Sequence, residues 1–353
     1  MNQHIIVIGG GIAGLASAWA LTQCGARVEV LERGEVGQES SWAGAGILSL
    51  LLPWGYPAAV TELAAHSQAR YPDWIADIRA HARIDPEFRR TGMLVRPPYD
   101  ATLAAPWSGH AIPTGLARFG DGLWLPEVAQ TRNPRLLQAI RAALLQSGAV
   151  IHSHCGAVGL ESSAGQITSA VAEDRRWEAD RYIVAAGAWS ADLLGPRAAG
   201  LPIYPVRGQM LLYRAAPDRL PCIVYENGHY LVPRADGHIL AGSTLEEVGF
   251  DKATTASAYA ELESFVAGVL PDVAEQGPIR HWAGLRPGSP GNVPIIDRHP
   301  ELSNLYVNGG HFRYGVTLAP ACAEHLADLI DGKPPKLEPR LFLWPDIIRA
   351  APV

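Results

Sequence analysis

The chain has 353 residues, of which 48% are hydrophobic and 18% are charged, as is usual for globular proteins. This length exceeds what one ordinary hydrophobic core organises, so we expect two domains. The formal net charge of −6 argues against a nucleic-acid partner, because such partners select basic surfaces. The four cysteines are scattered without a CxxC pair, which fits a reducing compartment and predicts no metal site. Since no basic leader precedes the first apolar run, we predict a cytoplasmic protein.

The first 32 residues predict a strand, a helix and a second strand. An apolar run at residues 4–8 predicts a buried strand, residues 15–24 predict a helix, and residues 27–31 predict the second strand. A GxGxxG sequence joins the first strand to the helix, whose first N–H groups are placed to face phosphates. These parts together form the βαβ fingerprint of a dinucleotide-binding domain.

Each residue of that fingerprint has a physical task. Gly9 permits the tight turn, Gly11 lets the backbone approach a pyrophosphate, and Gly14 lets the helix pack closely on the strand. Glu32 ends the second strand, 18 residues after Gly14, and can accept a hydrogen bond from a ribose hydroxyl. The same acid disfavours NADP, because it repels a 2′-phosphate that Arg33 could otherwise bind.

The remaining chain predicts a mixed α/β fold. A helix at 134–148 and several short strands precede a small-residue turn at 186–190, and short strands separated by turns from 203 to 286 predict an antiparallel sheet. A strand at 305–308 and a helix at 315–330 return the chain to the first domain. We therefore predict a Rossmann-like FAD-binding domain of residues 1–80, 134–200 and 290–353, and a substrate-binding domain of residues 81–133 and 201–289 with a large antiparallel sheet.

One uncharged stretch, residues 42–60, is almost long enough to span a bilayer. Its three glycines and prolines at 53 and 57 would leave backbone groups unsatisfied in lipid. We predict a buried loop, with contact between part of this loop and a membrane as the alternative.

Two features favour FAD over NAD. Residues 39–46 form a loop of hydroxyl-bearing and small side chains that can wrap an extended cofactor. Residues 307–315 form a strand–glycine–helix unit whose helix directs its positive end at a ligand. A reduced flavin carries negative charge, which such a helix end stabilises.

At these motifs the chain resembles the D-amino-acid oxidase superfamily of FAD-dependent enzymes, and within it the bacterial glycine oxidases of thiamine biosynthesis. The resemblance runs nearly end to end. It rests on the N-terminal fingerprint, the loop at 41–46, Val232-Pro233-Arg234 after Tyr230, the run at 282–287, and the run at 311–315 followed by Leu318-Ala319-Pro320.

The resemblance implies roles for individual residues. Arg286 clamps the substrate carboxylate, Tyr230 donates its hydroxyl to the same group, and Arg313 lies beside them, so these three are the expected catalytic residues. Gly46, Ile47 and Leu245 would complete the substrate pocket. The expected cofactor contacts are Gly9, Gly11, Ile12, Ala13, Gly14, Glu32, Arg33, Ser40, Ser41, Ala45, Gly46, Ile47, Ala157, Ala186, Gly187, Trp189, Gly284, Arg286, His311, Arg313, Tyr314, Gly315, Val316 and Thr317.

Some positions depart from the family pattern or admit two interpretations. Gly228 stands where the family has a histidine, Leu245 replaces a methionine, and Tyr314 replaces an asparagine, so the identity of the amino acid stays open. Arg207 either lines the flavin cavity or bridges sheets. His152 shares a strand face with His154, without a third metal ligand.

The implied activity is oxidative deamination of a small amino acid by non-covalently bound FAD, with molecular oxygen as acceptor. Glycine is the first candidate substrate, followed by sarcosine and small D-amino acids, and the products are a 2-oxo acid, ammonia and hydrogen peroxide. The alternatives are a D-amino-acid dehydrogenase that passes electrons to a quinone, and a flavin-binding module without turnover. A tRNA-modifying relative is disfavoured by the acidic balance. A dimer or tetramer is possible.

Overall fold

The computed structural model describes residues 2–344, and the last nine residues of the predicted FAD-binding domain lie outside this range. Its first sheet has six strands in the order β18-β19-β12-β1-β2-β8, all parallel except the pairing of β18 with β19. The strands are β1 (His4–Ile8), β2 (Arg27–Leu31), β8 (Val150–His152), β12 (Arg181–Val184), β18 (Ile295–Arg298) and β19 (Leu305–Gly309).

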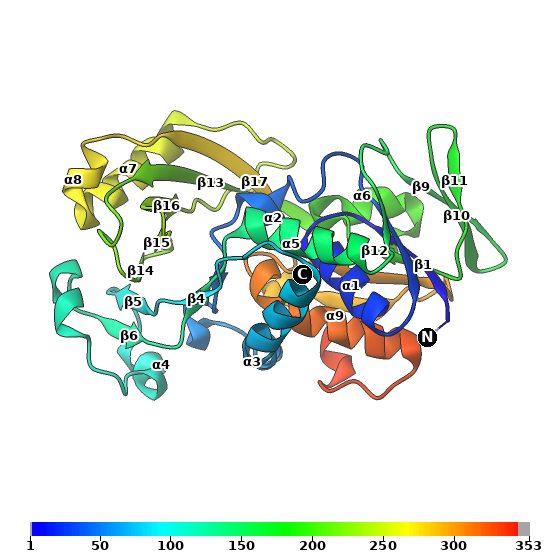
Figure 1. Cartoon of the computed structure of the whole chain (residues 1–353), viewed down its shortest axis with the longest axis horizontal. Coiled ribbons are helices and arrows are strands. Elements are labelled where there is room, and N and C mark those ends of the chain that lie inside the picture. The colour runs from blue at the N-terminus through cyan, green and yellow to red at the C-terminus, as the bar shows by residue number, and fades with distance from the viewer. Residues whose placement is uncertain (1, 345–353) are drawn as a thin grey trace.

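Both faces of this sheet are buried, as is usual for parallel sheets. Side chains alternate along β1, so Ile5 and Val7 join the larger core cluster while Ile6 and Ile8 join a second cluster on the other face. The helices of the larger cluster contact one another and lie together in Figure 1: α1 (Ile12–Gln23), α3 (Ala58–His81), α5 (Asn133–Gln146) and α9 (Gly315–Asp331).

The second large sheet has seven strands in the order β17-β13-β16-β15-β14-β5-β6. Its pairings are antiparallel except that of β14 with β5. Figure 1 shows it beside α7 and α8, at the opposite end of the molecule from β9–β11. The elements are β5 (Met93–Arg96), β6 (Leu123–Leu125), β13 (Tyr204–Arg214), β14 (Ile223–Glu226), β15 (His229–Pro233), β16 (His238–Gly242), β17 (Arg280–Gly288), α7 (Ala256–Val269) and α8 (Pro271–Ala274).

The two faces of this sheet have different neighbours. Leu211 and Leu231 pack with Leu262 of α7 in a local core, whereas Met210 and Tyr230 belong to the main core cluster. The face that carries Met210 and Tyr230 therefore turns toward the first sheet, and the site lies between the two sheets.

Smaller elements complete the fold. Two three-stranded sheets have the orders β3-β7-β4 and β11-β10-β9. The strands of these two sheets are β3 (Ile47–Leu48), β4 (Arg89–Arg90), β7 (Ala129–Gln130), β9 (Gly159–Ser163), β10 (Gln166–Ala172) and β11 (Arg175–Trp177). The short helices are α2 (Ser40–Ala43), α4 (Ala101–Ala104) and α6 (Ser190–Leu194). The boundaries of two domains remain a prediction.

The predicted α/β class, with a Rossmann-like sheet and an antiparallel sheet, is confirmed. Residues 42–60, predicted as a buried loop, are largely irregular between α2 and α3, but the stretch also contains the end of α2, the strand β3, a 3₁₀ turn at Pro53–Gly55 and the start of α3. Among residues 2–344, no helix combines the length and apolar character that crossing a membrane requires.

Glu29 of β2 is a buried carboxylate held by one residue each of β1, β2 and β8. Its oxygens lie 3.0 Å from His4 Nε2, 2.9 Å from His152 Nε2 and 3.0 Å from Arg27 Nη2. Burial raises the pKa of Glu29, but the hydrogen bond from His152 and the nearby His4 and Arg27 outweigh it, so the pKa lies below its ordinary value. Glu29 thus contributes stability mainly in its charged form.

We expect Glu29→Gln to lower the free energy of unfolding at pH 7 by about 1–3 kcal/mol. Because the folded-state pKa is lowered, this contribution is complete above about pH 5 and is lost as the pH falls through the lowered value. Denaturant unfolding of both proteins at several pH values measures it, with the exposed Glu62→Gln as control. A stability difference that grows on acidification would contradict this account.

Candidate active site

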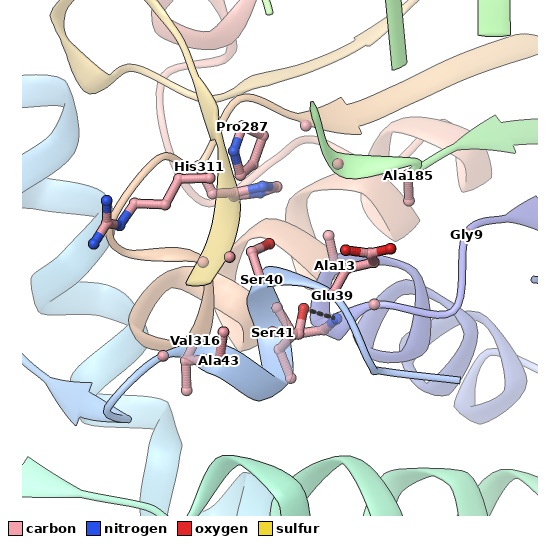
Figure 2. A pocket seen from close by; sticks show the side chains of 18 of the residues that line it. Gly9, Ala13, Glu39, Ser40, Ser41, Ala43, Ala185, Pro287, His311 and Val316 are labelled. Carbon is pink, nitrogen blue, oxygen red and sulfur yellow. Dashed lines mark hydrogen bonds between the residues drawn. The ribbon is translucent and has the colours of Figure 1, made fainter. Parts of the chain in front are cut away.

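A cavity of about 440 Å³ runs between the two large sheets, within the size range of small-molecule sites. In Figure 2, Gly9 and Ala185 lie toward one side of it and His311 toward the other, with Ser41 between them. The predicted site residues that line it are Gly9, Gly11, Ile12, Ala13, Glu32, Arg33, Ser40, Ser41, Ala45, Gly46, Ile47, Ala157, Ala186, Gly187, Trp189, Tyr230, Gly284, Arg286, His311, Arg313, Tyr314, Gly315 and Val316.

The glycine turn after β1 leaves no room for side chains. A Cβ on Gly9, whose φ is +114°, would lie 2.3 Å from the carbonyl oxygen of Ala185. A Cβ on Gly14 would lie 1.9 Å from the carbonyl oxygen of Gly9, so Gly14 sets the close packing of α1 on the turn instead of lining the cavity. This is the geometry that brings the start of α1 to the cavity wall.

Glu32 and Ser41 organise the backbone around this turn. The Glu32 carboxylate accepts hydrogen bonds from the N–H of Gly10 at 2.7 Å and of Gly34 at 2.9 Å. Each oxygen keeps a further lone pair, and the side chain lines the cavity. Ser41 Oγ accepts from the N–H of Ile12 at 2.9 Å, the bond dashed in Figure 2, and so docks α2 onto the first turn of α1.

Arg286, on β17, presents a cation at the other end of the cavity. Its Nη1 donates to the carbonyl oxygens of Thr244 at 3.1 Å and Arg207 at 3.3 Å, which leaves its other N–H groups available. Among the described residues no carboxylate pairs with it. Burial lowers the pKa of Arg286 to about 10, which still leaves the guanidinium charged at neutral pH.

Gly208 of the neighbouring strand β13 makes room for that guanidinium. Gly208 pairs with Gly284 in the sheet, and a Cβ on it would lie 2.0 Å from Arg286 Nη2. The position of the cation therefore depends on the absence of a side chain at residue 208.

Tyr230, Arg313 and Tyr314 lie around Arg286. The Tyr230 hydroxyl is next to the Arg286 guanidinium and donates to the sulfur of Met210 at 3.6 Å. Arg313 Nη2 donates to the carbonyl oxygen of Gly228 at 3.2 Å. Gly228 is part of the Asn-Gly turn between β14 and β15, both of whose residues have positive φ. The hydroxyl of Tyr314 contacts that of Tyr56.

His311 is almost fully buried beside the cavity. Burial lowers the pKa of His311 to about 4, so its imidazole is neutral at physiological pH. It therefore adds no charge to the site, and the cations at this end are Arg286 and Arg313.

Besides Gly14, two predicted site residues, Leu245 and Thr317, do not line the cavity. The placement of Leu245 in the substrate pocket is wrong, since Leu245 is 56% exposed. Its neighbour Thr244 is buried and accepts a hydrogen bond from the N–H of Gln209, whereas the side chain of Leu245 faces solvent. Thr317 is buried, and its hydroxyl donates to the carbonyl oxygen of Ile47 at 2.9 Å.

Sequence reasoning missed several residues at the cavity, including Asn133, Gly208, Met210 and Asn308. Asn133 donates to the carbonyl oxygens of Ser41 and Gly44 at 2.8 and 3.0 Å. Its position before Pro134, at a helix start, was the available signal. Arg207 bridges elements of the substrate side, since it pairs with Glu246 and with Asp251 at 2.7 Å.

These features fit an extended, anionic dinucleotide. Glycines open a cradle at the start of α1, and the N–H groups of Ala45 and Gly46, which line the cavity, have no acceptor in the described part of the chain. The sequence model of the protein family described as FAD dependent oxidoreductase (DAO) matches residues 4–329 of the chain. The chain belongs to this FAD-dependent oxidoreductase family.

Individual relatives agree with this membership. This FAD-dependent oxidoreductase is 40% identical to the glycine oxidase of Pseudomonas aeruginosa over 96% of the chain and 98% of the relative. It is 30% identical to the bifunctional protein ThiO/ThiG of Synechocystis over 93% of the chain and 52% of that protein. The solved glycine oxidase of Geobacillus kaustophilus superposes with a TM-score of 0.88 at 26% identity, covering 97% of this chain and 98% of that one.

Proposed function

We propose that the protein oxidises a small amino acid, glycine first, with non-covalently bound FAD and with oxygen as electron acceptor. The observation that carries this proposal is the pair of cavity-facing guanidiniums, Arg286 and Arg313, which have no carboxylate partner among residues 2–344. A half-buried cation that lines a cavity without a counter-ion favours an anionic ligand, so a ligand carboxylate would complete this site. The 40% identity to a glycine oxidase supports the substrate.

The chain's own residues would hold and orient the amino acid. Arg286 would donate to the carboxylate through the N–H groups that its carbonyl partners leave free, and Tyr230 would donate its hydroxyl to the same group. Two carbonyls fix the guanidinium, so the substrate Cα would be presented in one orientation. FAD would supply the redox chemistry by accepting a hydride.

The reaction needs no side-chain base if the amine arrives neutral. Loss of two hydrogens converts glycine to its imine, which water hydrolyses to glyoxylate and ammonia, while oxygen takes the two electrons and becomes hydrogen peroxide. Burial leaves His311 neutral. The pH dependence of turnover would then follow the substrate amine.

Several finer expectations belong to this proposal. We assign the predicted cofactor-binding residues that line the cavity to FAD, and Gly46 and Ile47 also to the substrate end. The similarity to the ThiO/ThiG protein supports a role in thiamine biosynthesis. We propose a cytoplasmic enzyme that forms a dimer or tetramer.

A screen of the purified protein tests the proposal. Its absorption spectrum reports bound flavin, and release of that flavin on denaturation shows that attachment is non-covalent. Glycine, sarcosine and small D-amino acids are then assayed for peroxide. Anaerobic bleaching without peroxide in air, restored by a quinone acceptor, would favour the dehydrogenase alternative. A bound flavin that no amino acid bleaches would contradict the proposed function.

We expect Gly208→Ala to raise the KM for the amino acid about tenfold, the loss of about 1.4 kcal/mol of binding. The added Cβ would displace the Arg286 guanidinium, from which it would lie 2.0 Å. Steady-state kinetics measures this change. Gly268→Ala is the matched control, because a Cβ there meets nothing within 4 Å. An unchanged KM in Gly208→Ala would show that the guanidinium position does not limit binding.

A further inference from the structure

The carbonyl oxygens of residues 43–48 are all hydrogen-bonded to the surrounding protein. This stretch, the carbonyl-anchored loop, runs from the end of α2 through β3 along the cavity. Its carbonyls accept, in order, from Trp282 Nε1 at 3.1 Å, Asn133 Nδ2 at 3.0 Å, Arg234 Nη2 at 2.6 Å, the Thr131 N–H at 2.9 Å, Thr317 Oγ1 at 2.9 Å and Gln68 Nε2 at 2.8 Å.

This anchoring decides which backbone groups the loop presents to the cavity. With every carbonyl bonded to protein, the groups left over are N–H groups, and those of Ala45 and Gly46 have no acceptor among the described residues. Consecutive N–H groups with free hydrogens favour negative charge. In an FAD site they would favour the reduced, anionic flavin over the oxidised one.

Arg234 is the charged member of these anchors. It follows β15, is 6% exposed, and donates to Gln130 Oε1 at 2.7 Å, to the carbonyl of Thr131 at 2.9 Å and to that of Ala45 at 2.6 Å. All three acceptors are neutral, and no described carboxylate pairs with it. A planar guanidinium joins β7 to the loop at a fixed spacing, which a flexible ammonium cannot do.

We propose that Arg234 is a positioning residue that, with the other carbonyl anchors, orients the Gly44–Ala45 and Ala45–Gly46 peptides so that their N–H groups stabilise the reduced flavin. The inference rests on the proposed function only in its assignment of FAD to this cavity. It does not depend on which amino acid is oxidised. Arg234 touches neither the cavity nor the substrate clamp, so its effect runs through the backbone of the loop.

The experiment measures the flavin reduction potential and the dissociation constant for sulfite. Sulfite binds a flavin more tightly when the surrounding protein stabilises negative charge on it. Arg234→Met and Arg234→Lys are compared with the wild type, each first checked for stoichiometric FAD. We expect both variants to bind sulfite at least tenfold more weakly and to have a reduction potential lower by about 30 mV. For a two-electron couple, about 30 mV corresponds to a tenfold change in the equilibrium constant. The KM for the amino acid should change little, because the clamp is intact.

Arg132→Met is the matched control. Arg132 is a neighbouring cation that pairs with Glu87 and Asp236 and does not contact the loop, so its loss should leave both quantities unchanged. If the Arg234 variants do not fold, Thr317→Val removes the hydroxyl that anchors Ile47 without changing charge, and the same direction is expected.

Three results would overturn the inference. One is wild-type potential and sulfite affinity in FAD-loaded Arg234→Met and Arg234→Lys. Another is an Arg234→Lys variant whose potential and sulfite affinity equal those of the wild type while Arg234→Met differs in both. That result would show that the charge alone acts, without positioning of the loop. The third is an unchanged Thr317→Val where the arginine variants cannot be studied. Failure of the wild type to bind FAD or to oxidise amino acids would instead count against the proposed function.

Discussion

Replacing Arg286 with alanine is expected to raise the KM for the amino acid by about 100- to 1,000-fold while FAD stays bound. The change removes both the charge and the fork that would meet the carboxylate, and loss of such a buried charge pair costs about 3–4 kcal/mol. Flavin content should persist, because Gly9 in the turn after β1 lies toward the other side of the cavity from Pro287, the neighbour of Arg286 in β17. Steady-state kinetics and the flavin spectrum measure the two effects separately.

A control from the same strand separates binding from folding. Arg280 also lies on β17, but it is exposed and stacks over Trp42 at 4.8 Å from the ring centroid. Arg280→Ala should leave the KM close to that of the wild type. Unchanged turnover of glycine in Arg286→Ala would remove the carboxylate clamp from the proposed mechanism.

Gly46→Ala should weaken FAD binding by at least about 100-fold, which corresponds to about 2.7 kcal/mol. Residue 46 has a φ of +72°, and a Cβ there would lie 2.2 Å from the carbonyl oxygen of Thr131 and 2.4 Å from Asn133 Oδ1. Neither atom can withdraw easily, since Thr131 adjoins β7 and Asn133 holds Ser41 and Gly44. The loop must shift, and with it the N–H groups of Ala45 and Gly46, two residues that line the cavity.

Titration of the apoprotein with FAD measures this effect. Gly55→Ala is the control within the same uncharged stretch, because its Cβ would meet only Leu52 Cβ, at an ordinary contact distance of 3.9 Å. An FAD affinity for Gly46→Ala equal to that of Gly55→Ala would show that the loop tolerates the displacement.

The cofactor half of the site could be predicted because its signals are local. Strands at 4–8 and 27–31 are found at those residues, and the helix begins at Ile12, three residues before its predicted start. Gly14 is required by its contact with the backbone of Gly9 in the same βαβ unit, and Gly9 has the positive φ that the turn needs. Such contacts leave a pattern within about 30 residues, so a single sequence shows them.

The helix α3 was missed for a physical reason. Its buried positions include the small residues Ala59, Ala64 and Ser67, which reduce the contrast between its two faces, and Pro72 lies inside it. The helix is held by packing on α5 and α9, which the sequence does not place beside it. Local pattern and propensity are weaker than tertiary packing in such a case.

By itself, the sequence determined the α/β class and the dinucleotide turn, and its family resemblance pointed to Arg286 and Tyr230 as the proposed carboxylate clamp. Only the tertiary structure decided that Leu245 faces away from the cavity, that Gly208 makes room for Arg286, and that Arg234 holds the carbonyl-anchored loop. The reason is separation along the chain. Arg234 and Ala45 are 189 residues apart, and no local periodicity encodes a hydrogen bond across that distance.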